Sequence, residues 1–274
     1  MIDKTLALKK KKDLLRLLRG IDSLLIAYSG GVDSTFLLAT AQEALGEKVL
    51  AVTSDSTIHP KRETEAAALF AKKNNIWHLI FSSEEIFMDK FISNGPDRCY
   101  HCKKSLFKNL SEIAHREGIS KIAHGANIDD ADDFRPGTKA AQEAGALAPL
   151  SDVSLGKNEI RYLSREMGLP THAKPSAACL ASRIPYGSPI TDIKLKMIER
   201  AEDFLINEGL RNVRVRHHGP LAKIEVSKDD LEKVIDVSLR ELIVEKFIEL
   251  GFKHIAVDLE GYSTGKMNRS LPGI

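Results

Sequence analysis

Short apolar runs alternate with amphipathic segments along the first half of the chain. The apolar runs predict buried strands over residues 23–29, 48–54, 76–81 and 121–126. Apolar residues at helical spacing predict helices over residues 30–45, 61–73 and 103–117. Strands that alternate with helices indicate an α/β fold, a parallel sheet with helices on both faces that binds ligands at the carboxyl ends of its strands. We expect Trp77, within the third run, in the core.

The last third of the chain has a different pattern. Two prolines and a glycine in I-P-Y-G-S-P-I-T, residues 184–191, indicate a linker or turn. Beyond it we expect a helix, two strands, a long helix and a final strand, over residues 193–207, 212–217, 222–226, 228–250 and 254–259. We therefore predict a first domain of residues 1–185 and a small α+β domain of residues 186–274 that serves substrate binding or homo-oligomer formation.

Composition and charge narrow the class of protein. The 274 residues are 43% hydrophobic, enough for a large core, and 40 Lys and Arg nearly cancel 38 Asp and Glu to give +2. The net charge is too small for electrostatic attraction of the whole molecule to nucleic acid or to an anionic membrane. No run of apolar residues approaches the ~18 that a membrane span requires. The leucines and basic face of residues 1–19 predict an amphipathic helix packed on its own domain. Three cysteines fit a reducing compartment, so we expect a cytoplasmic protein. Because of its charge and its short apolar runs, we expect neither a membrane nor a stable nucleic-acid partner.

The hexapeptide S-G-G-V-D-S follows the first predicted strand and opens a predicted helix. In this position backbone N–H groups and the helix N-terminus converge on an anion, and the glycines allow a tight turn. A carboxylate beside phosphates needs a divalent cation between them, so Asp33 indicates Mg²⁺. The alternative is a glycine-rich turn with Asp33 or Ser34 as helix N-cap. The predicted nucleotide-binding residues are Ser29, Gly30, Gly31, Val32, Asp33 and Ser34.

The same hexapeptide closely resembles the signature of the PP-loop ATP pyrophosphatases, which have an adenine nucleotide alpha hydrolase-like fold. The resemblance implies that ATP is cleaved between its α and β phosphates, that AMP is placed on an oxygen of the substrate and that pyrophosphate is released. A nucleophile then displaces AMP. The motif does not identify that nucleophile.

The three cysteines leave several interpretations open. Cys99 and Cys102 are separated by two residues and can chelate one metal or cluster, whereas Cys179 lies far downstream. They could form a redox dithiol, pack without a function, or hold an iron-sulfur cluster with one iron open to sulfide. They could also form a zinc site whose fourth ligand is His101, His124 or His172.

Five blocks of the sequence resemble the LarE family of ATP-dependent sulfur transferases, which build the nickel-pincer nucleotide cofactor. The blocks cover residues 29–37, 96–103, 125–137, 174–187 and 261–268. The resemblance implies that the substrate is pyridinium-3,5-biscarboxylic acid mononucleotide and that the product is a thiocarboxylate. Three cysteines resemble the family's cluster-bearing type, which implies that Cys99, Cys102 and Cys179 hold a 4Fe-4S cluster. A sulfide donor is then a further partner.

Basic side chains supply candidate contacts for an anionic substrate. Lys174 and Arg183 flank Cys179, so we expect them, together with Cys179 and Asp33, in catalysis; the alternative is surface charge. Strand alternation places Arg214 and Arg216 on one face with His218, as in a row that binds phosphate or carboxylate. The alternative for this row is a solvated strand face or a subunit contact.

An acidic loop follows the fourth predicted strand. Asp129 could hold Mg²⁺ or position the nucleotide, as could Asp130, Asp132 and Asp133; the alternative is an acidic loop that caps the following helix. Two other functions compete with sulfur transfer to a small molecule. A tRNA thiolase is disfavoured by the near-neutral charge and by the lack of aromatic residues within a basic patch. The other is a nucleotide-binding iron-sulfur or zinc sensor without catalysis.

Overall fold

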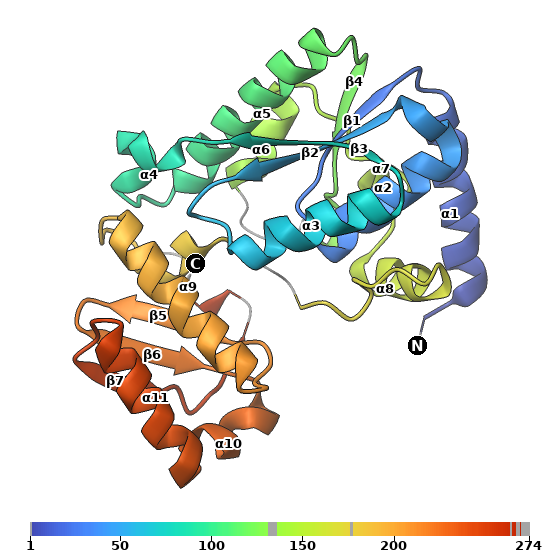
Figure 1. The fold of residues 1–274 in the computed structure, drawn as a ribbon. Helices are drawn as coiled ribbons and strands as arrows, with labels where there is room; N and C mark the ends of the chain where they lie inside the picture. The colour runs from blue at the N-terminus through green and yellow to red at the C-terminus, as the bar shows by residue number, and fades with distance from the viewer. Residues whose placement is uncertain (1, 131–135, 176–177, 264, 267–268, 270–274) are drawn as a thin grey trace. The chain divides into compact units, whose positions relative to one another are not determined.

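The structure is a computed structural model that describes residues 2–130, 136–175, 178–263, 265–266 and 269. The chain divides into two compact units (Figure 1). Unit 1 comprises Met1–Glu85 and Asp97–Ala177, and unit 2 comprises Ile86–Pro96 and Ala178–Ile274. The domain division expected at residue 185 stays a prediction. No helix of the described residues combines the length and the apolar character needed to cross a membrane.

Unit 1 is built on a four-stranded sheet in which every neighbouring pair is parallel. Its strands are β1 (Leu24–Ala27), β2 (Val49–Asp55), β3 (Trp77–Ser82) and β4 (Lys121–His124). Their order in the sheet is β3-β2-β1-β4, with Leu24 of β1 in register with Val49 and with Lys121. The predicted parallel α/β fold is confirmed.

Helices cover both faces of this sheet (Figure 1). They are α1 (Lys4–Arg19), α2 (Val32–Leu45), α3 (Lys61–Lys73), α5 (Arg98–Arg116), α6 (Pro136–Glu143), α7 (Pro149–Asp152) and α8 (Lys157–Glu166). Successive residues of a strand point to opposite faces. Leu24 and Ile26 accordingly join a core with residues of α1, α2 and α8, whereas Leu25 joins a second core with residues of α5 and α6.

The strand order places the loop after β1 at a special position. From β1 the chain proceeds to β2 and β3 on one side, and it then returns to place β4 on the other side of β1. The direction of winding therefore reverses next to β1. In open α/β sheets such a switch point leaves a crevice at the carboxyl ends of the strands, where ligands bind.

Trp77 does not lie in the core. Its side chain is 44% exposed, because β3 is an edge strand of the sheet. The expectation of a buried tryptophan is therefore wrong. Strand character was predicted from the apolar run, but an edge strand has neighbours on one side only and can leave large side chains in solvent.

Unit 2 is a small α+β unit, as predicted. It contains β5 (Arg214–His218), β6 (Leu221–Glu225) and β7 (His254–Val257), with α4 (Asp89–Ile92), α9 (Asp192–Asn207), α10 (Leu231–Ile235) and α11 (Val237–Glu249). The strand order is β5-β6-β7, antiparallel between β5 and β6 and parallel between β6 and β7. The single helix expected over residues 228–250 is interrupted at Asp236, whose side chain caps α11 by accepting a hydrogen bond from Ser238 N at 3.1 Å.

One buried asparagine ties residues 86–96 to the expected linker within unit 2. Asn94 is fully buried, and its amide donates to the carbonyl oxygens of Ile184 at 3.3 Å, Pro185 at 2.8 Å and Ser188 at 2.8 Å. In the other direction, Gly187 N donates to Asn94 O at 3.1 Å. These bonds explain why a segment far upstream in the sequence belongs to unit 2.

Candidate functional site

The loop of residues 29–34 connects β1 to α2 at the switch point. Gly31 is the N-cap residue of α2 and forms no side-chain capping bond, so neither Asp33 nor Ser34 is the N-cap. Gly30 has φ +67°, and a Cβ there would lie 3.1 Å from Ala67 Cβ of α3. Both the backbone conformation and the close approach of α3 therefore require glycine at position 30.

Hydroxyl groups hold the loop in a fixed shape. Ser29 Oγ and Ser34 Oγ lie 3.1 Å apart, and Gly31 N donates to Ser29 Oγ at 3.4 Å. On the other side, a Cβ on Gly125 would lie 2.9 Å from Ser34 N, so the residue after β4 must also be small. The N-terminus of α2 thus presents its N–H groups at the end of the sheet, an arrangement suited to phosphate.

Asp33 combines burial with an unsatisfied oxygen. Its Oδ2 lies 3.3 Å from Lys157 Nζ of α8, whereas Oδ1 is buried and accepts no hydrogen bond within the described part of the chain. Burial raises the pKa of Asp33, and the Lys157 charge partly offsets that rise. A carboxylate oxygen in this state needs a cation or water, and Mg²⁺ prefers such an oxygen ligand. The residues present therefore fit Mg²⁺.

Lys174 lies against the loop. Its Nζ donates to Gly30 O at 2.9 Å and forms an ion pair with Glu63 Oε2 of α3 at 2.6 Å. Arg161 of α8 holds the same segment by donating to His172 O at 2.8 Å and to Lys174 O at 2.7 Å. Lys174 is thus placed beside the nucleotide loop, and in this arrangement it steadies a loop carbonyl.

The acidic loop is engaged with the backbone. Asp129 Oδ2 accepts a hydrogen bond from Lys157 N at the start of α8, at 2.6 Å, and Asp130 Oδ2 accepts one from Asn127 N at 3.1 Å. Asp129 therefore contacts the start of α8 and not of α6, the α-helix that follows the loop in the chain. Capping of the following helix and a role of Asp129 at the nucleotide both stay predictions. Asp132 and Asp133, candidates from the same loop, lie outside the described residues.

Two of the three cysteines share one turn of helix. α5 begins at Arg98, five residues before the helix start expected at residue 103, so Cys99 and Cys102 both lie near its N-terminus, about one turn apart. Residues three apart on a helix lie on the same side, and both thiols are half-buried. Two thiolates on one side of a helix fit two of the ligands that an iron-sulfur cluster requires.

The third cysteine belongs to unit 2 and directly precedes the 3₁₀-helix η4 (Leu180–Arg183). Cys179 is half-buried, and its carbonyl oxygen accepts a hydrogen bond from Arg183 Nη1 at 3.0 Å. No disulfide links the three cysteines, all of which lie in the described ranges. Nor do three or more His, Cys, Asp or Glu of those ranges form a group that could hold a metal ion.

Arg183 is buried within unit 2. It is 1% exposed, donates to Ala178 O at 2.7 Å, and forms a bidentate pair with Glu202 of α9 at 2.8 and 2.9 Å. Its guanidinium therefore fixes the backbone on both sides of Cys179. The contact with substrate or AMP expected for Arg183 stays a prediction.

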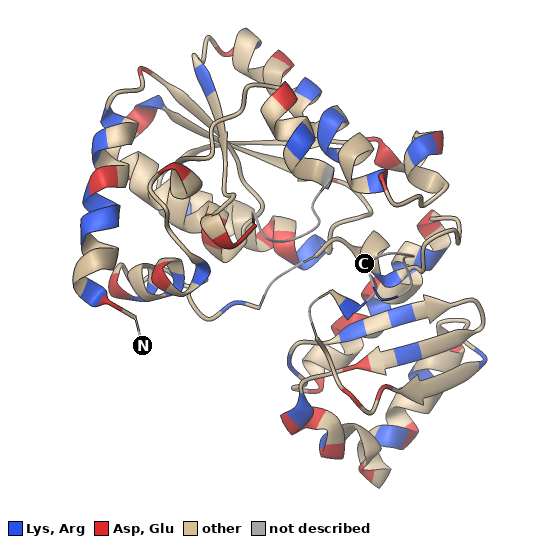
Figure 2. Cartoon of the chain, turned by 180° about the vertical axis from the view of Figure 1, so that it is seen from behind, with Lys and Arg blue, Asp and Glu red and all other residues tan. Residues whose placement is uncertain are grey.

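Arg214 and Arg216 share one face of β5, as strand alternation predicts, but that face is covered. They are 7% and 5% exposed, so a solvated strand face is excluded. Arg216 pairs with Glu225 Oε2 at 2.7 Å and donates to Ser182 O at 2.9 Å. The Arg214 guanidinium lies 4.8 Å from the ring centre of Tyr262. Figure 2 shows the basic segments on the strands of this sheet.

The three buried arginines of this region act on one another. Arg183 and Arg216 each lie close enough to Arg214 for their charges to affect it. Burial, and then the neighbouring Arg183 charge, lower the pKa of Arg214. The binding of phosphate or carboxylate expected for Arg214 and Arg216 stays a prediction.

Sequence patterns did not indicate the acidic and basic partners of these residues. The partners come from helices and strands distant in the sequence, and no local motif marks them. They are Glu63, Lys157, Arg161, Glu202 and Glu225.

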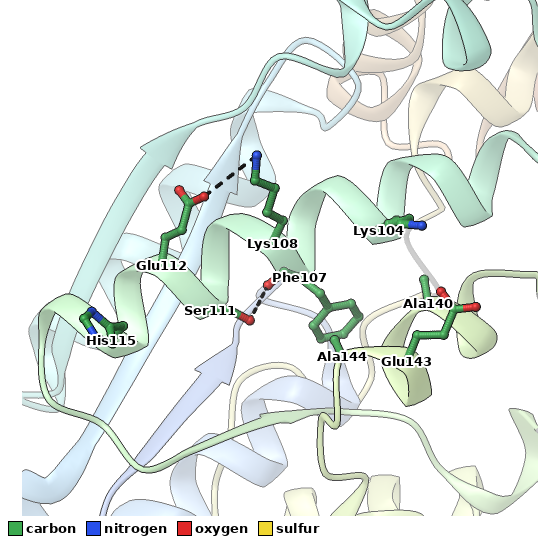
Figure 3. A pocket seen from close by; sticks show the side chains of 9 residues that line it. All are labelled: Lys104, Phe107, Lys108, Ser111, Glu112, His115, Ala140, Glu143 and Ala144. Carbon is green, nitrogen blue, oxygen red and sulfur yellow. Dashed lines mark hydrogen bonds and ion pairs between the residues drawn. The ribbon is translucent and has the colours of Figure 1, made fainter.

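A groove of about 590 Å³ lies between α5 and α6, lined by residues from both helices (Figure 3). Its lining includes Lys104, Phe107 and Glu143, and it contains none of the site residues predicted from the sequence. The groove therefore shares no lining residue with the nucleotide loop or with the three cysteines.

Comparison with known proteins relates the chain to enzymes. A Lactiplantibacillus plantarum protein named pyridinium-3,5-bisthiocarboxylic acid mononucleotide synthase is 32% identical over 263 residues, 96% of this chain and 95% of that protein. The uncharacterized protein slr1717 of Synechocystis is 40% identical over 266 residues, 96% of this chain and 99% of that protein. A subunit of the glutamine-hydrolyzing GMP synthase of Thermoplasma volcanium is 29% identical over 197 residues, 66% of this chain and 62% of that protein. No protein-family model matches the chain.

Proposed function

Because the chain belongs to the LarE family of PP-loop ATP pyrophosphatases, we propose that it converts pyridinium-3,5-biscarboxylic acid mononucleotide to a thiocarboxylate for nickel-pincer nucleotide synthesis. Membership of the family makes it an ATP-dependent enzyme. The observation that carries the proposal is the half-buried Asp33 carboxylate, whose buried Oδ1 accepts no hydrogen bond among the described residues, in a phosphate loop at the N-terminus of α2.

The first step activates a carboxyl group of the substrate. A carboxylate oxygen attacks the α-phosphorus of ATP, the bond to the β-phosphate breaks, and pyrophosphate leaves with the electron pair. The N–H groups of the loop and the α2 N-terminus stabilise the negative charge of the phosphates. Asp33 would hold Mg²⁺, which when bound neutralises charge on the departing pyrophosphate. Lys174 keeps the loop in place through Gly30 O and Glu63.

The second step replaces oxygen by sulfur. A carboxylate is a poor electrophile with a poor leaving group, whereas the acyl-adenylate carries AMP as a good one. Hydrosulfide attacks the acyl carbon, the bond to AMP breaks, and the proton of hydrosulfide passes to solvent. Two rounds convert both carboxyl groups.

The cysteines account for the sulfur. We infer that Cys99, Cys102 and Cys179 hold a 4Fe-4S cluster, which when bound would supply sulfide for transfer. The pair on one turn of α5 and the half-buried thiol before η4 support this assignment through their donor chemistry. Arg183 holds the backbone around Cys179 and so orients its thiol.

Unit 2 would bind an anionic group of the substrate. Arg214 and Arg216 lie on one strand, and the guanidinium group is a bidentate donor to phosphate and carboxylate, which supports this proposal. The identity of the sulfide donor and the homo-oligomer stay predictions.

The test is anaerobic reconstitution followed by turnover of the full chain. Wild-type protein is mixed with ATP, Mg²⁺, sulfide and the pyridinium biscarboxylic acid mononucleotide, and AMP, pyrophosphate and the thiocarboxylate product are measured. We expect AMP and pyrophosphate to form only with the carboxylated nucleotide. Asp33→Asn should abolish AMP formation, whereas Cys179→Ser should still adenylate the substrate without producing thiocarboxylate.

Cys102→Ser separates the cluster from the remaining proposal. Iron and sulfide counts should fall in this variant together with thiocarboxylate yield, and Ser105→Ala on the same helix serves as its control. A zinc-containing protein with full turnover in Cys102→Ser would remove the cluster from the mechanism. AMP formation that requires tRNA and not the mononucleotide would overturn the proposed substrate.

A further inference from the structure

The segment after β7 folds back against the small sheet. Residues 258–263 and 265–266, here called the strap, include Asp258, whose N donates to Ile224 O at 2.9 Å, and Tyr262, whose N donates to Val226 O at 2.7 Å. These bonds extend the pairing of β6 beyond the end of β7. Most of the strap belongs to one of the five blocks that resemble the LarE family, and neither step of the proposed reaction uses it.

Gly261 permits the strap to lie this close to the sheet. Its φ is +69°, and a Cβ on it would lie 2.8 Å from Val226 O, a distance that no real Cβ tolerates. Any other residue would move the strap away from β6. The path of the strap before Tyr262 therefore requires glycine at position 261.

Lys266 closes the strap on itself. Its side chain is 9% exposed, and Nζ lies 2.6 Å from Asp258 Oδ1 and 2.9 Å from Glu260 Oε2. Burial would raise the pKa of Asp258, but hydrogen bonds from Lys223 and Lys266 hold it well below its usual range. The carboxylate is therefore charged throughout the physiological range, and its ion pair with Lys223 fastens the strap to β6.

The strap is also connected to the arginines of β5. Lys223 Nζ lies 2.8 Å from Asp258 Oδ2 and 3.2 Å from Glu225 Oε1, and Glu225 pairs with Arg216. A line of alternating charges thus runs from the strap to Arg216. Such a network resists the displacement of any one member.

Tyr262 covers the second arginine. The Arg214 guanidinium lies 4.8 Å from the centre of the Tyr262 ring, within the range of a cation–π contact. Like charges on Arg183 and Arg216 repel Arg214. The face of the ring carries negative potential and attracts the guanidinium, so it opposes that repulsion and limits the directions in which Arg214 can turn.

We propose that Tyr262 is a positioning residue, whose ring the strap holds against Arg214 so that this guanidinium is aimed at a phosphate or carboxylate of the mononucleotide substrate. The proposal rests on the proposed function and deepens it. It assigns the strap to substrate affinity and not to ATP use, because each of these contacts lies within unit 2 and the nucleotide loop belongs to unit 1.

The experiment compares Tyr262→Leu, which removes the ring, with Tyr262→Phe, which keeps it. In the full chain, modification of Arg214 by phenylglyoxal is followed by peptide mass mapping. We expect Tyr262→Leu to raise the rate of Arg214 modification by about 10-fold and Tyr262→Phe to leave it unchanged.

In turnover, Tyr262→Leu should raise KM for the pyridinium mononucleotide by about 10-fold, with KM for ATP unchanged. Lys266→Met should give a smaller change of the same kind, and Lys246→Met, from an ion pair on α11, should give none.

Unchanged Arg214 modification in Tyr262→Leu would overturn the proposal. Faster modification with an unchanged KM for the mononucleotide would overturn the link between Tyr262 and the substrate. Failure of the proposed function can be distinguished from failure of the Tyr262 proposal, because it is seen as absent turnover in the wild type. In that case the proposal is decided in the wild type, Tyr262→Leu and Tyr262→Phe by two measurements. These are the rate of Arg214 modification and the affinity for nicotinic acid mononucleotide, measured by calorimetry.

Discussion

Arg183 and Glu202 form a bidentate ion pair inside unit 2, with nitrogen–oxygen distances of 2.8 and 2.9 Å and almost no exposed surface on either side chain. Glu202 Oε1 also accepts a hydrogen bond from Val215 N of β5 at 2.9 Å. The same guanidinium holds Ala178 O and Cys179 O. One pair therefore joins α9, β5 and the backbone that carries a proposed sulfur ligand.

Replacement of Glu202 by alanine should destabilise the protein strongly. It would leave the Arg183 charge buried without its carboxylate, which costs about 3–5 kcal/mol of unfolding free energy. Urea unfolding monitored by circular dichroism measures the change. Glu249→Ala is the matched control, because Glu249 pairs with Lys246 on the surface of α11 and its loss should cost under about 1 kcal/mol. Equal losses in the two variants would contradict the structural role of the buried pair.

Gly125→Ala should impair ATP use while leaving the fold intact. The new Cβ would lie 2.9 Å from Ser34 N and 3.2 Å from Asp33 C, so the first turn of α2 must shift. We expect kcat/KM for ATP to fall by about 100-fold, because phosphate positioning depends on that turn. Gly20→Ala is the control, since its Cβ meets only Leu17 O at 3.4 Å at the end of α1. Wild-type ATP kinetics in Gly125→Ala would show that the loop does not position the nucleotide.

Lys174→Met should raise KM for ATP by about 10-fold, because it releases Gly30 O and leaves Glu63 without its ion pair. Steady-state kinetics with ATP as the varied substrate measures the effect. The control is Lys196→Met, which removes an exposed ion pair with Asp192 on α9 and should leave KM unchanged. If Lys174→Met instead lowered kcat with KM for ATP unchanged, the lysine would act on the reacting groups and not on the loop.

The phosphate loop could be predicted because its information is local. A buried strand, two glycines and a helix follow one another directly, and the backbone conformation of Gly30 and the start of α2 depend on little else. The partner of Asp33 could not be predicted, because Lys157 lies 124 residues away and belongs to a helix whose face is determined by packing. Sequence patterns indicate which residues are charged, but they do not indicate which charges meet.

The early start of α5 has a similar explanation. Asp97 is the N-cap residue, but its side chain makes no capping bond, so the sequence before Cys99 carries no strong start signal. The cysteine pair was therefore expected before the helix and lies within it. On β5, alternation predicted that Arg214 and Arg216 share a face; it could not predict the burial of that face, because Tyr262 and Ser182 cover it from other segments.

Two half-buried histidines of unit 1 should make stability depend on pH. Burial lowers the pKa of His59 and of His124 to about 4, and His59 Nδ1 has no hydrogen-bond partner among the described residues. In the unfolded chain a histidine has a pKa of about 6.5. Between those values the unfolded state binds a proton that the folded state does not bind. The stability that each neutral histidine contributes is therefore present above pH ~6.5 and is lost as pH falls toward 4.

Each histidine should add a slope of at most about 1.4 kcal/mol per pH unit to the unfolding free energy between pH 6.5 and 4. Urea unfolding at a series of pH values measures this slope in the wild type, in His59→Gln, in His124→Gln and in the double variant. Carboxylates elsewhere titrate equally in all four proteins, so the difference between curves isolates the histidines. We expect the slope of each single variant to fall by an amount equivalent to the uptake of up to about one proton on unfolding. The slope of the double variant should fall by up to about twice that amount. A double variant that kept the full wild-type slope would show that both side chains take up protons in the folded state, and that the space around them at the ends of β2 and β4 is open to water.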